Sequence, residues 1–140
     1  MQRIILLFLA MLFSEVSAWA QHAPVLILSL ARTQFARGGK DNRHAWYDVG
    51  QATAGLCLQA TAMGLYVHQM AGFSADKARA TFAVPAGYEP VACMAVGYLG
   101  EAATADPAFA ARDGAPRARS GIDVFVYGAT WGEFPDSLRD

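Results

Sequence analysis

The stretch from Ala45 to Met63 constrains the fold of this chain more than any other part of the sequence. It is the longest segment that the pattern predicts to be helical, and apolar side chains occupy several of its faces. After His44, its one charged residue is Asp48. A helix that is apolar all round has to be covered on more than one side. The sequence therefore predicts a helix that packs both on the core of its own chain and on a second surface, such as another subunit.

The residues that flank this helix suggest where it starts and stops. Asp41 or Asn42 is expected to start it, and Gly64 is expected to form a left-handed cap just past its end. Gly50 and Gly55 lower the helix propensity of the segment. We therefore expect these two glycines to serve close packing or a ligand.

Short apolar runs and turn residues predict the elements around the helix. The pattern predicts, in chain order, a strand at 23–31, a loop at 33–44, a strand at 65–69, a turn at 70–73, a short helix capped by Ser74, a strand at 88–99, a loop or frayed helix at 101–116 and a short strand at 122–127. Strands separated by helices favour a layered α+β or α/β structure.

Composition and motifs exclude several functional classes. Hydrophobic residues make up 54% of the 140 residues, which argues against disorder, and the net charge of −1 gives no electrostatic footprint for nucleic acid. The three histidines lack metal-ligand spacing, and no nucleophile or phosphate-loop motif occurs. Cys57 and Cys93 are expected to be buried free thiols, with a disulfide as the alternative.

The N-terminus has the three parts of a secretory signal peptide. Arg3 supplies the charge, residues 4–13 supply an apolar run, and Ala18-Trp19-Ala20 resembles a cleavage site before Gln21. The run is too short to span a bilayer, so no stable membrane span is expected. The alternative interpretation is a buried helix at the start of the domain.

The order of several segments resembles the C-terminal part of the nitroreductase family. The segments are WA..APVLIL, then HAWYDVGQATAGLCLQATAMGLYVHQMAGFSADKARATFAVPAGYEPVACMAVGYLG, then PRARSGIDVFVYGATWGE. The resemblance implies an α+β sandwich with a central sheet, flanking helices and two intertwined subunits. It also implies an FMN-dependent oxidoreductase that moves hydride from NAD(P)H to a nitroaromatic, a quinone or a similar acceptor.

The resemblance also implies which residues hold the cofactor. Backbone N–H groups of one turn are expected to lie beside the flavin ring; the residues are Gln69, Met70, Ala71 and Gly72. Arg117 and Arg119 resemble a basic pair that grips the FMN phosphate, a task that suits the forked guanidinium group. Because the cofactor carries the chemistry, no catalytic side chain is expected.

The resemblance leaves the N-terminal half of the family's domain unmatched. We expect residues 1–17 to be an apolar segment that replaces this half, residues 18–133 to form the C-terminal part of the domain, and residues 134–140 to form a tail. On this interpretation the WA..APVLI segment belongs to the enzyme interior and the chain is cytoplasmic. The alternatives are a non-catalytic fragment that does not hold FMN, and a small exported binding protein cleaved after Ala20.

Overall fold

The chain divides into two compact units, and the boundary along the sequence lies between Leu99 and Gly100. The computed structural model describes residues 15–101 and 106–138. The predicted apolar run at 4–13 lies outside the described residues. Each unit is described below by itself.

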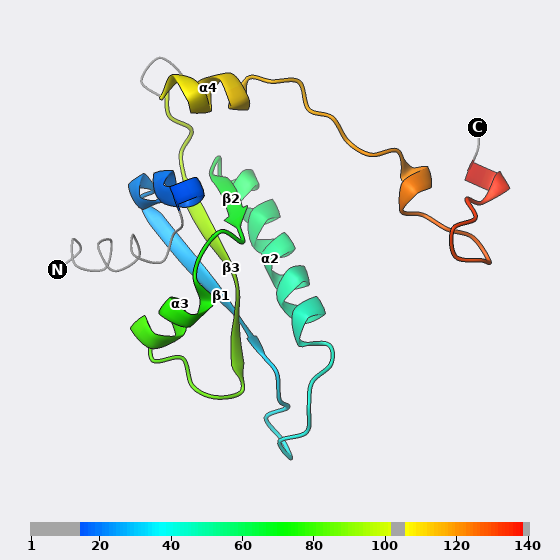
Figure 1. The fold of residues 1–140 in the computed structure, drawn as a ribbon, viewed down its shortest axis with the longest axis horizontal. Helices are drawn as coiled ribbons and strands as arrows, with labels where there is room; N and C mark the ends of the chain where they lie inside the picture. The colour runs from blue at the N-terminus through cyan, green and yellow to red at the C-terminus, as the bar shows by residue number, and fades with distance from the viewer. Residues whose placement is uncertain (1–14, 102–105, 139–140) are drawn as a thin grey trace. The chain divides into compact units, whose positions relative to one another are not determined.

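The first unit is built on a three-stranded antiparallel sheet (Figure 1). Its strands are β1 (Val25–Arg32), β2 (Tyr66–Met70) and β3 (Tyr88–Gly97). Strand β3 lies in the centre and pairs with β1 on one side and β2 on the other. The three predicted strands are therefore confirmed, with ends within two residues of those expected.

The two faces of the sheet are covered by different helices. Helix α2 (Ala45–Ala62) lies over one face, where its side chains line a cavity together with Ile27, Ser29 and Met94. The opposite face carries α3 (Ala75–Thr81) and the 3₁₀-helix η1 (Glu15–His22), which pack against Leu26 and its neighbours. This arrangement is a layered α+β sandwich, and it confirms the predicted fold class.

The core on the η1–α3 side is formed by small and flexible side chains. Ala20, Met70, Cys93 and Ala95 form one buried cluster, against which the partly buried Trp19 packs. The Trp19 ring also contacts His68 edge-on, with ring centroids 4.8 Å apart. The residues predicted to form a cleavage site at Ala18–Ala20 thus lie in η1, and Ala20 is completely buried.

Helix α2 begins and ends close to the expected positions, but its start differs in detail. His44 is the N-cap residue and makes no side-chain capping bond. Asn42 instead accepts a hydrogen bond from the His44 N–H (3.1 Å), one turn before the helix. The expectation that Asp41 or Asn42 caps the helix is therefore wrong. Gly64 has φ +73°, as expected for a left-handed cap.

Much of the α2 surface is open in the single chain. Its buried residues are Ala45, Thr53 and Ala60, all on the side that faces the sheet. Tyr47 is 68% exposed and Leu58 is 74% exposed. Within the described residues of the first unit, this apolar helix is thus buried at Ala45, Thr53 and Ala60 and exposed at Tyr47 and Leu58.

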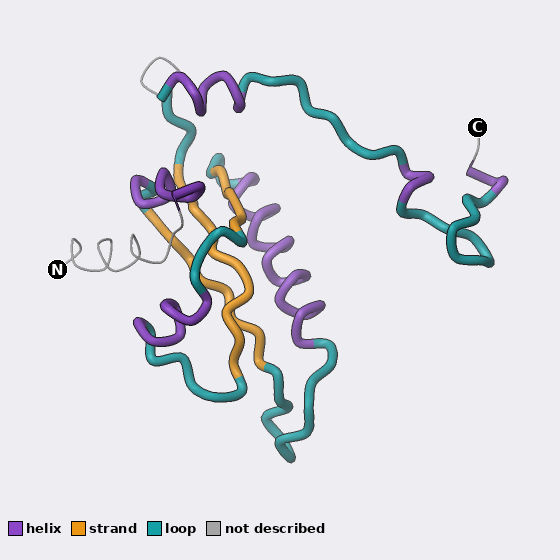
Figure 2. Tube along the Cα trace, in the orientation of Figure 1, coloured by secondary structure: helices purple, strands orange, loops and turns teal. Residues whose placement is uncertain are grey.

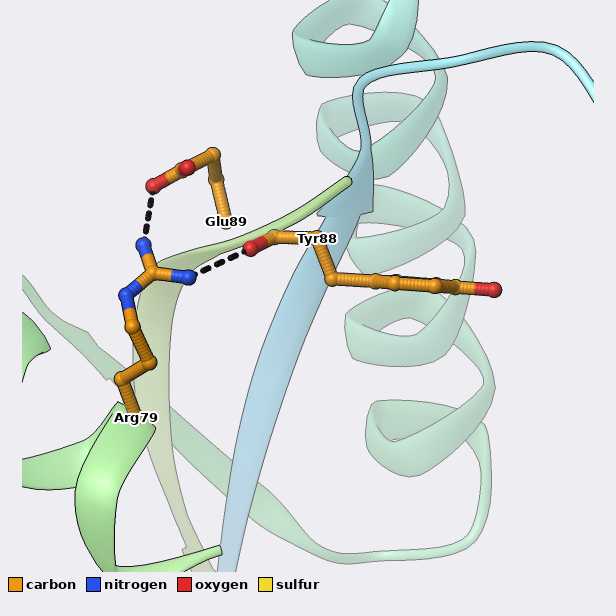
Figure 3. Close-up of polar contacts among 3 residues, drawn as sticks. All are labelled: Arg79, Tyr88 and Glu89. Carbon is orange, nitrogen blue, oxygen red and sulfur yellow. Dashed lines mark hydrogen bonds and ion pairs between the residues drawn. The ribbon is translucent and has the colours of Figure 1, made fainter. Parts of the chain in front are cut away.

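Helix α3 is capped at its start and bonded to β3 near its end. Ser74 accepts a hydrogen bond from the Lys77 N–H (3.2 Å), which confirms it as the N-cap. Near the other end, Arg79 donates to the Tyr88 carbonyl oxygen (2.8 Å) and forms an ion pair with Glu89 (Figure 3). Because Arg79 and Glu89 are both partly exposed, this ion pair contributes about 1 kcal/mol or less.

The second unit contains little regular structure. It holds α4 (Pro107–Asp113) and two 3₁₀-helices, η3 (Ile122–Val124) and η4 (Asp136–Leu138), joined by loops (Figure 2). The predicted strand at 122–127 is wrong, because η3 occupies its first half and loop the rest. No strand among the described residues of this unit is available to pair with it.

None of the helices in residues 15–101 and 106–138 is both long enough and apolar enough to cross a membrane.

The Ser74 cap provides a direct test of the α3 boundary. We expect Ser74→Ala to lower the free energy of unfolding by about 1 kcal/mol, because the Lys77 N–H loses its acceptor. Ser74→Asp, which can also accept this bond, is the matched control and should stay close to wild type. Urea denaturation measures both. Equal losses in the two variants would show that the cap bond does not matter.

The position of Ala20 predicts the effect of trimming the N-terminus. A chain that begins at Gln21 lacks Ala20 and Trp19, which pack on the sheet. We expect it to melt about 10 °C below a chain that begins at Glu15, because buried apolar surface is lost. Thermal unfolding followed by circular dichroism compares the two chains. Equal melting temperatures would mean that η1 does not stabilise the fold.

Candidate functional site

The segment Gln69–Gly72 lies at the end of an edge strand. Strand β2 ends at Met70, and its side away from β3 is not paired within the described residues. The Met70 side chain is 6% exposed and belongs to the core, so it anchors the segment. Ala71 is exposed, and its carbonyl oxygen accepts from the Phe73 N–H (2.9 Å). This tight turn presents backbone, rather than side chains, at the edge of the sheet.

The Gln69 side chain points toward α2. Gln69 pairs with Met94, and both therefore face the α2 side of the sheet. Its Nε2 atom lies 3.4 Å from Cys57 Sγ, to which it donates a hydrogen bond. Sequence reasoning missed this contact, because Cys57 and Gln69 belong to different elements and only the strand register brings them together.

Arg117 and Arg119 lie in a loop of the second unit, after α4. Both residues are exposed, and neither forms an ion pair with another described residue. Arg119 Nη1 donates to the carbonyl oxygen of the preceding residue, Ala118 (2.9 Å). The two guanidinium groups are thus available to an anion. They belong to a different unit from Gln69–Gly72, so the structure does not bring the two predicted groups together in one described site.

Two neighbouring cavities lie between α2 and β1. The larger, of about 280 Å³, is lined by Ile27, Ser29, Leu30, Val49, Ala52, Thr53, Leu56 and Met94. The second, of about 240 Å³, shares Leu30, Val49 and Ala52 and has polar groups from Arg32, Asn42 and Asp48. Both cavities are mainly apolar. The helical spacing of Val49, Ala52, Thr53 and Leu56 was a usable signal for this face.

The titratable and metal-binding groups give the site little acid–base chemistry. Burial raises the pKa of the Cys93 thiol above its ordinary value of 9.0, and a backbone hydrogen bond from Met94 opposes this only in part. Cys57 and Cys93 are both free, which confirms the expectation of free thiols, although Cys57 is half-buried rather than buried. Among the described residues no cluster of histidine, cysteine and carboxylate side chains could hold a metal ion.

The first unit coincides with a known family. The sequence profile of the nitroreductase family matches residues 15–98, which is more than half of the chain. The chain belongs to the nitroreductase family. It is also 40% identical over 127 residues to an uncharacterized 15.4 kDa protein in the ask 5′ region of Mycolicibacterium smegmatis, covering 89% of this chain and 82% of that protein.

Solved structures of the family have the same fold. An oxidoreductase containing FMN superimposes with a TM-score of 0.78 at 25% identity, covering 89% of this chain and 64% of that one. A nitroreductase family protein from Clostridium difficile 630 gives a TM-score of 0.57 at 24% identity, covering 79% of this chain and 62% of that one. The nitroreductase chain therefore spans slightly less than two thirds of the length of these two structures.

The two cysteines predict a contrast in thiol reactivity. At pH 8 we expect a disulfide reagent to label Cys57 in the native chain but not Cys93, which is 1% exposed and has a raised pKa. Cys57→Ala should abolish native labelling and Cys93→Ala should leave it unchanged. Both thiols should react in denaturant, which serves as the control.

The raised pKa of Cys93 predicts how the free energy of unfolding changes with pH. Because the Cys93 pKa is raised on folding, its contribution to stability is complete below about pH 9 and is lost as the pH rises through the folded-state pKa. Rapid labelling of Cys93 in the native chain at pH 8 would contradict this description of the core.

Proposed function

We propose that this chain is an FMN-dependent oxidoreductase of the nitroreductase type. The observation that carries the proposal is the likeness, at a TM-score of 0.78 and 25% identity, to an oxidoreductase containing FMN. When bound, FMN would supply transfer of hydride from NAD(P)H to a nitroaromatic, a quinone or a similar acceptor. The family match over residues 15–98, which is most of the first unit, supports this assignment.

The residues of this chain fit the chemical requirements of FMN in two places. The turn at Gln69–Gly72 lies at an open sheet edge, where its backbone N–H groups would bond the polar edge of the flavin ring. Burial of the Met70 side chain holds this backbone in place. Arg117 and Arg119 carry exposed guanidinium groups that form no ion pair with another described residue and would bind the FMN phosphate by charge-assisted hydrogen bonds.

The same chain is proposed to act as a homodimer. Tyr47, Gly50, Ala54 and Leu58 recur at helical spacing on the exposed side of α2. A Cβ atom at Gly50 would meet nothing within 4 Å in the single chain, so its own chain gives no packing reason for this glycine. A second copy of α2 would cover this stripe and allow the two backbones to approach closely.

A second candidate function is favoured by one observation. The chain spans 64% of the FMN-containing structure that it resembles. The FMN of that structure belongs to a longer protein and is not established for this chain. A family member that folds and associates but does not retain FMN is the alternative.

Gel filtration in the presence of FMN distinguishes these functions. The enzyme proposal predicts a yellow protein peak after free flavin is removed, at the mass of a dimer. It also predicts oxidation of NAD(P)H when a nitroaromatic or a quinone is added. A colourless and inactive peak would overturn the proposal in favour of the alternative.

The phosphate contacts can be tested in the same assay. Arg117→Ala with Arg119→Ala should weaken FMN binding about tenfold or more, because at least one charged hydrogen bond is lost. Lys77→Ala removes an exposed cation of α3 and is the matched control, with affinity expected near wild type. An equal loss in the control would show that only overall charge matters.

A further inference from the structure

The segment that joins β1 to α2 forms a small β-hairpin that the proposed function does not use. Gln34 and Asp41 form a backbone bridge, the Phe35 N–H donates to the Lys40 carbonyl oxygen (2.8 Å), and the Asn42 N–H donates to that of Thr33 (2.7 Å). The segment extends beyond the ends of β1 and α2 (Figure 1). These bonds make it an ordered element rather than a plain loop.

Positive charge is concentrated in this hairpin. Residues 32–43 contain four of the chain's 11 basic residues and one acidic residue, whereas the chain as a whole has a net charge of −1. Arg37 and Lys40 are exposed, and neither side chain forms an ion pair or a hydrogen bond with another described residue. Arg32 lies over the Tyr88 ring instead, 5.8 Å from its centroid.

The backbone of the tip brings the two unpaired cations together. Gly38 and Gly39 separate Arg37 from Lys40, and both have positive φ angles, +85° and +64°. Such angles favour glycine and let the chain reverse tightly. Three residues of chain span at most about 11 Å, so the two long side chains can reach one bound anion.

The two sides of the hairpin differ in chemistry. Directly paired residues share a face, so Phe35 and Lys40 lie on one face and Gln34 and Asp41 on the other. A Cβ atom at Gly87 would lie 3.5 Å from Gln34 Oε1, which places the Gln34 face against the body of the unit. The face turned away therefore combines a cation with Phe35, which is 50% exposed, while the single carboxylate lies on the opposite face.

We propose that this hairpin binds the adenosine phosphate end of the nicotinamide dinucleotide donor. The inference rests on the proposed function, which requires NAD(P)H as the electron donor. This donor carries phosphate groups and an aromatic adenine base. Arg37 and Lys40 pair with phosphate oxygens, and Phe35 stacks on the base. Asp48 lines the cavity together with Arg32 and Asn42, and it lies on α2 rather than on the hairpin.

Binding of adenosine phosphates to the full chain tests the proposal without flavin. We expect 5′-ADP, 2′,5′-ADP or both to bind, and Arg37→Ala with Lys40→Ala to raise their dissociation constants about tenfold or more. Lys77→Ala on α3 is the matched control and should change them less than twofold. A preference for 2′,5′-ADP would assign the site to the 2′-phosphate of NADPH, and a preference for 5′-ADP would assign it to the pyrophosphate. Equal binding would assign it to the 5′-phosphate that both probes share.

The outcomes separate this inference from the proposed function. Absence of ADP binding, or an equal loss in Lys77→Ala, would overturn the hairpin site whether or not FMN is retained. Conversely, a colourless protein that still binds ADP through Arg37 and Lys40 would overturn the enzyme proposal and leave the hairpin site standing. Arg37→Gln with Lys40→Gln, which keeps polar side chains, is a second variant should the alanine variant fold poorly.

Discussion

The central position of β3 is the constraint on which the rest of the first unit depends. Met94 of β3 faces the α2 side of the sheet and lines the cavity there, whereas Cys93 and Ala95 belong to the buried cluster on the η1–α3 side. Met94 and Cys93 illustrate this alternation, since they are adjacent in sequence and belong to opposite faces. A slip of one residue in the pairing would exchange these faces and remove Cys93 from the core. The same register fixes Gln69 beside Cys57 and thus sets the geometry of the turn that follows.

The elements that could be predicted from the sequence are those whose pattern is local. The apolar runs of β1 and β3, the Ser74 cap and the left-handed Gly64 each require only neighbouring residues. The first residue of α2 matches the prediction, but its cap could not be predicted, because Asn42 and Asp41 are engaged by pairing across a hairpin. The run at 122–127 has the composition of a strand, yet a strand needs a partner, and pairing is not a local property.

The candidate site shows the same contrast between features set by neighbouring residues and features set by contacts between distant segments. The turn after β2 could be predicted because a turn leaves a local signal, whereas Arg117 and Arg119 were assigned to the cofactor by resemblance to the family. The sequence did not reveal that Met70 anchors the turn by burial, or that Gln69 is drawn toward α2. Such orientations depend on which face of the sheet a residue occupies, and the face is set by contacts with strands distant in sequence.

The exposed apolar surface of α2 and the charged hairpin favour different kinds of contact. Hydrophobic residues form 54% of the sequence, yet large side chains such as Tyr47 and Leu58 remain exposed on α2. Contact with a second copy would bury apolar surface there, whereas the basic tip at Arg37 and Lys40 would resist burial because desolvating unpaired charges is costly. The helix surface therefore favours association, and the hairpin favours an anionic ligand in solvent.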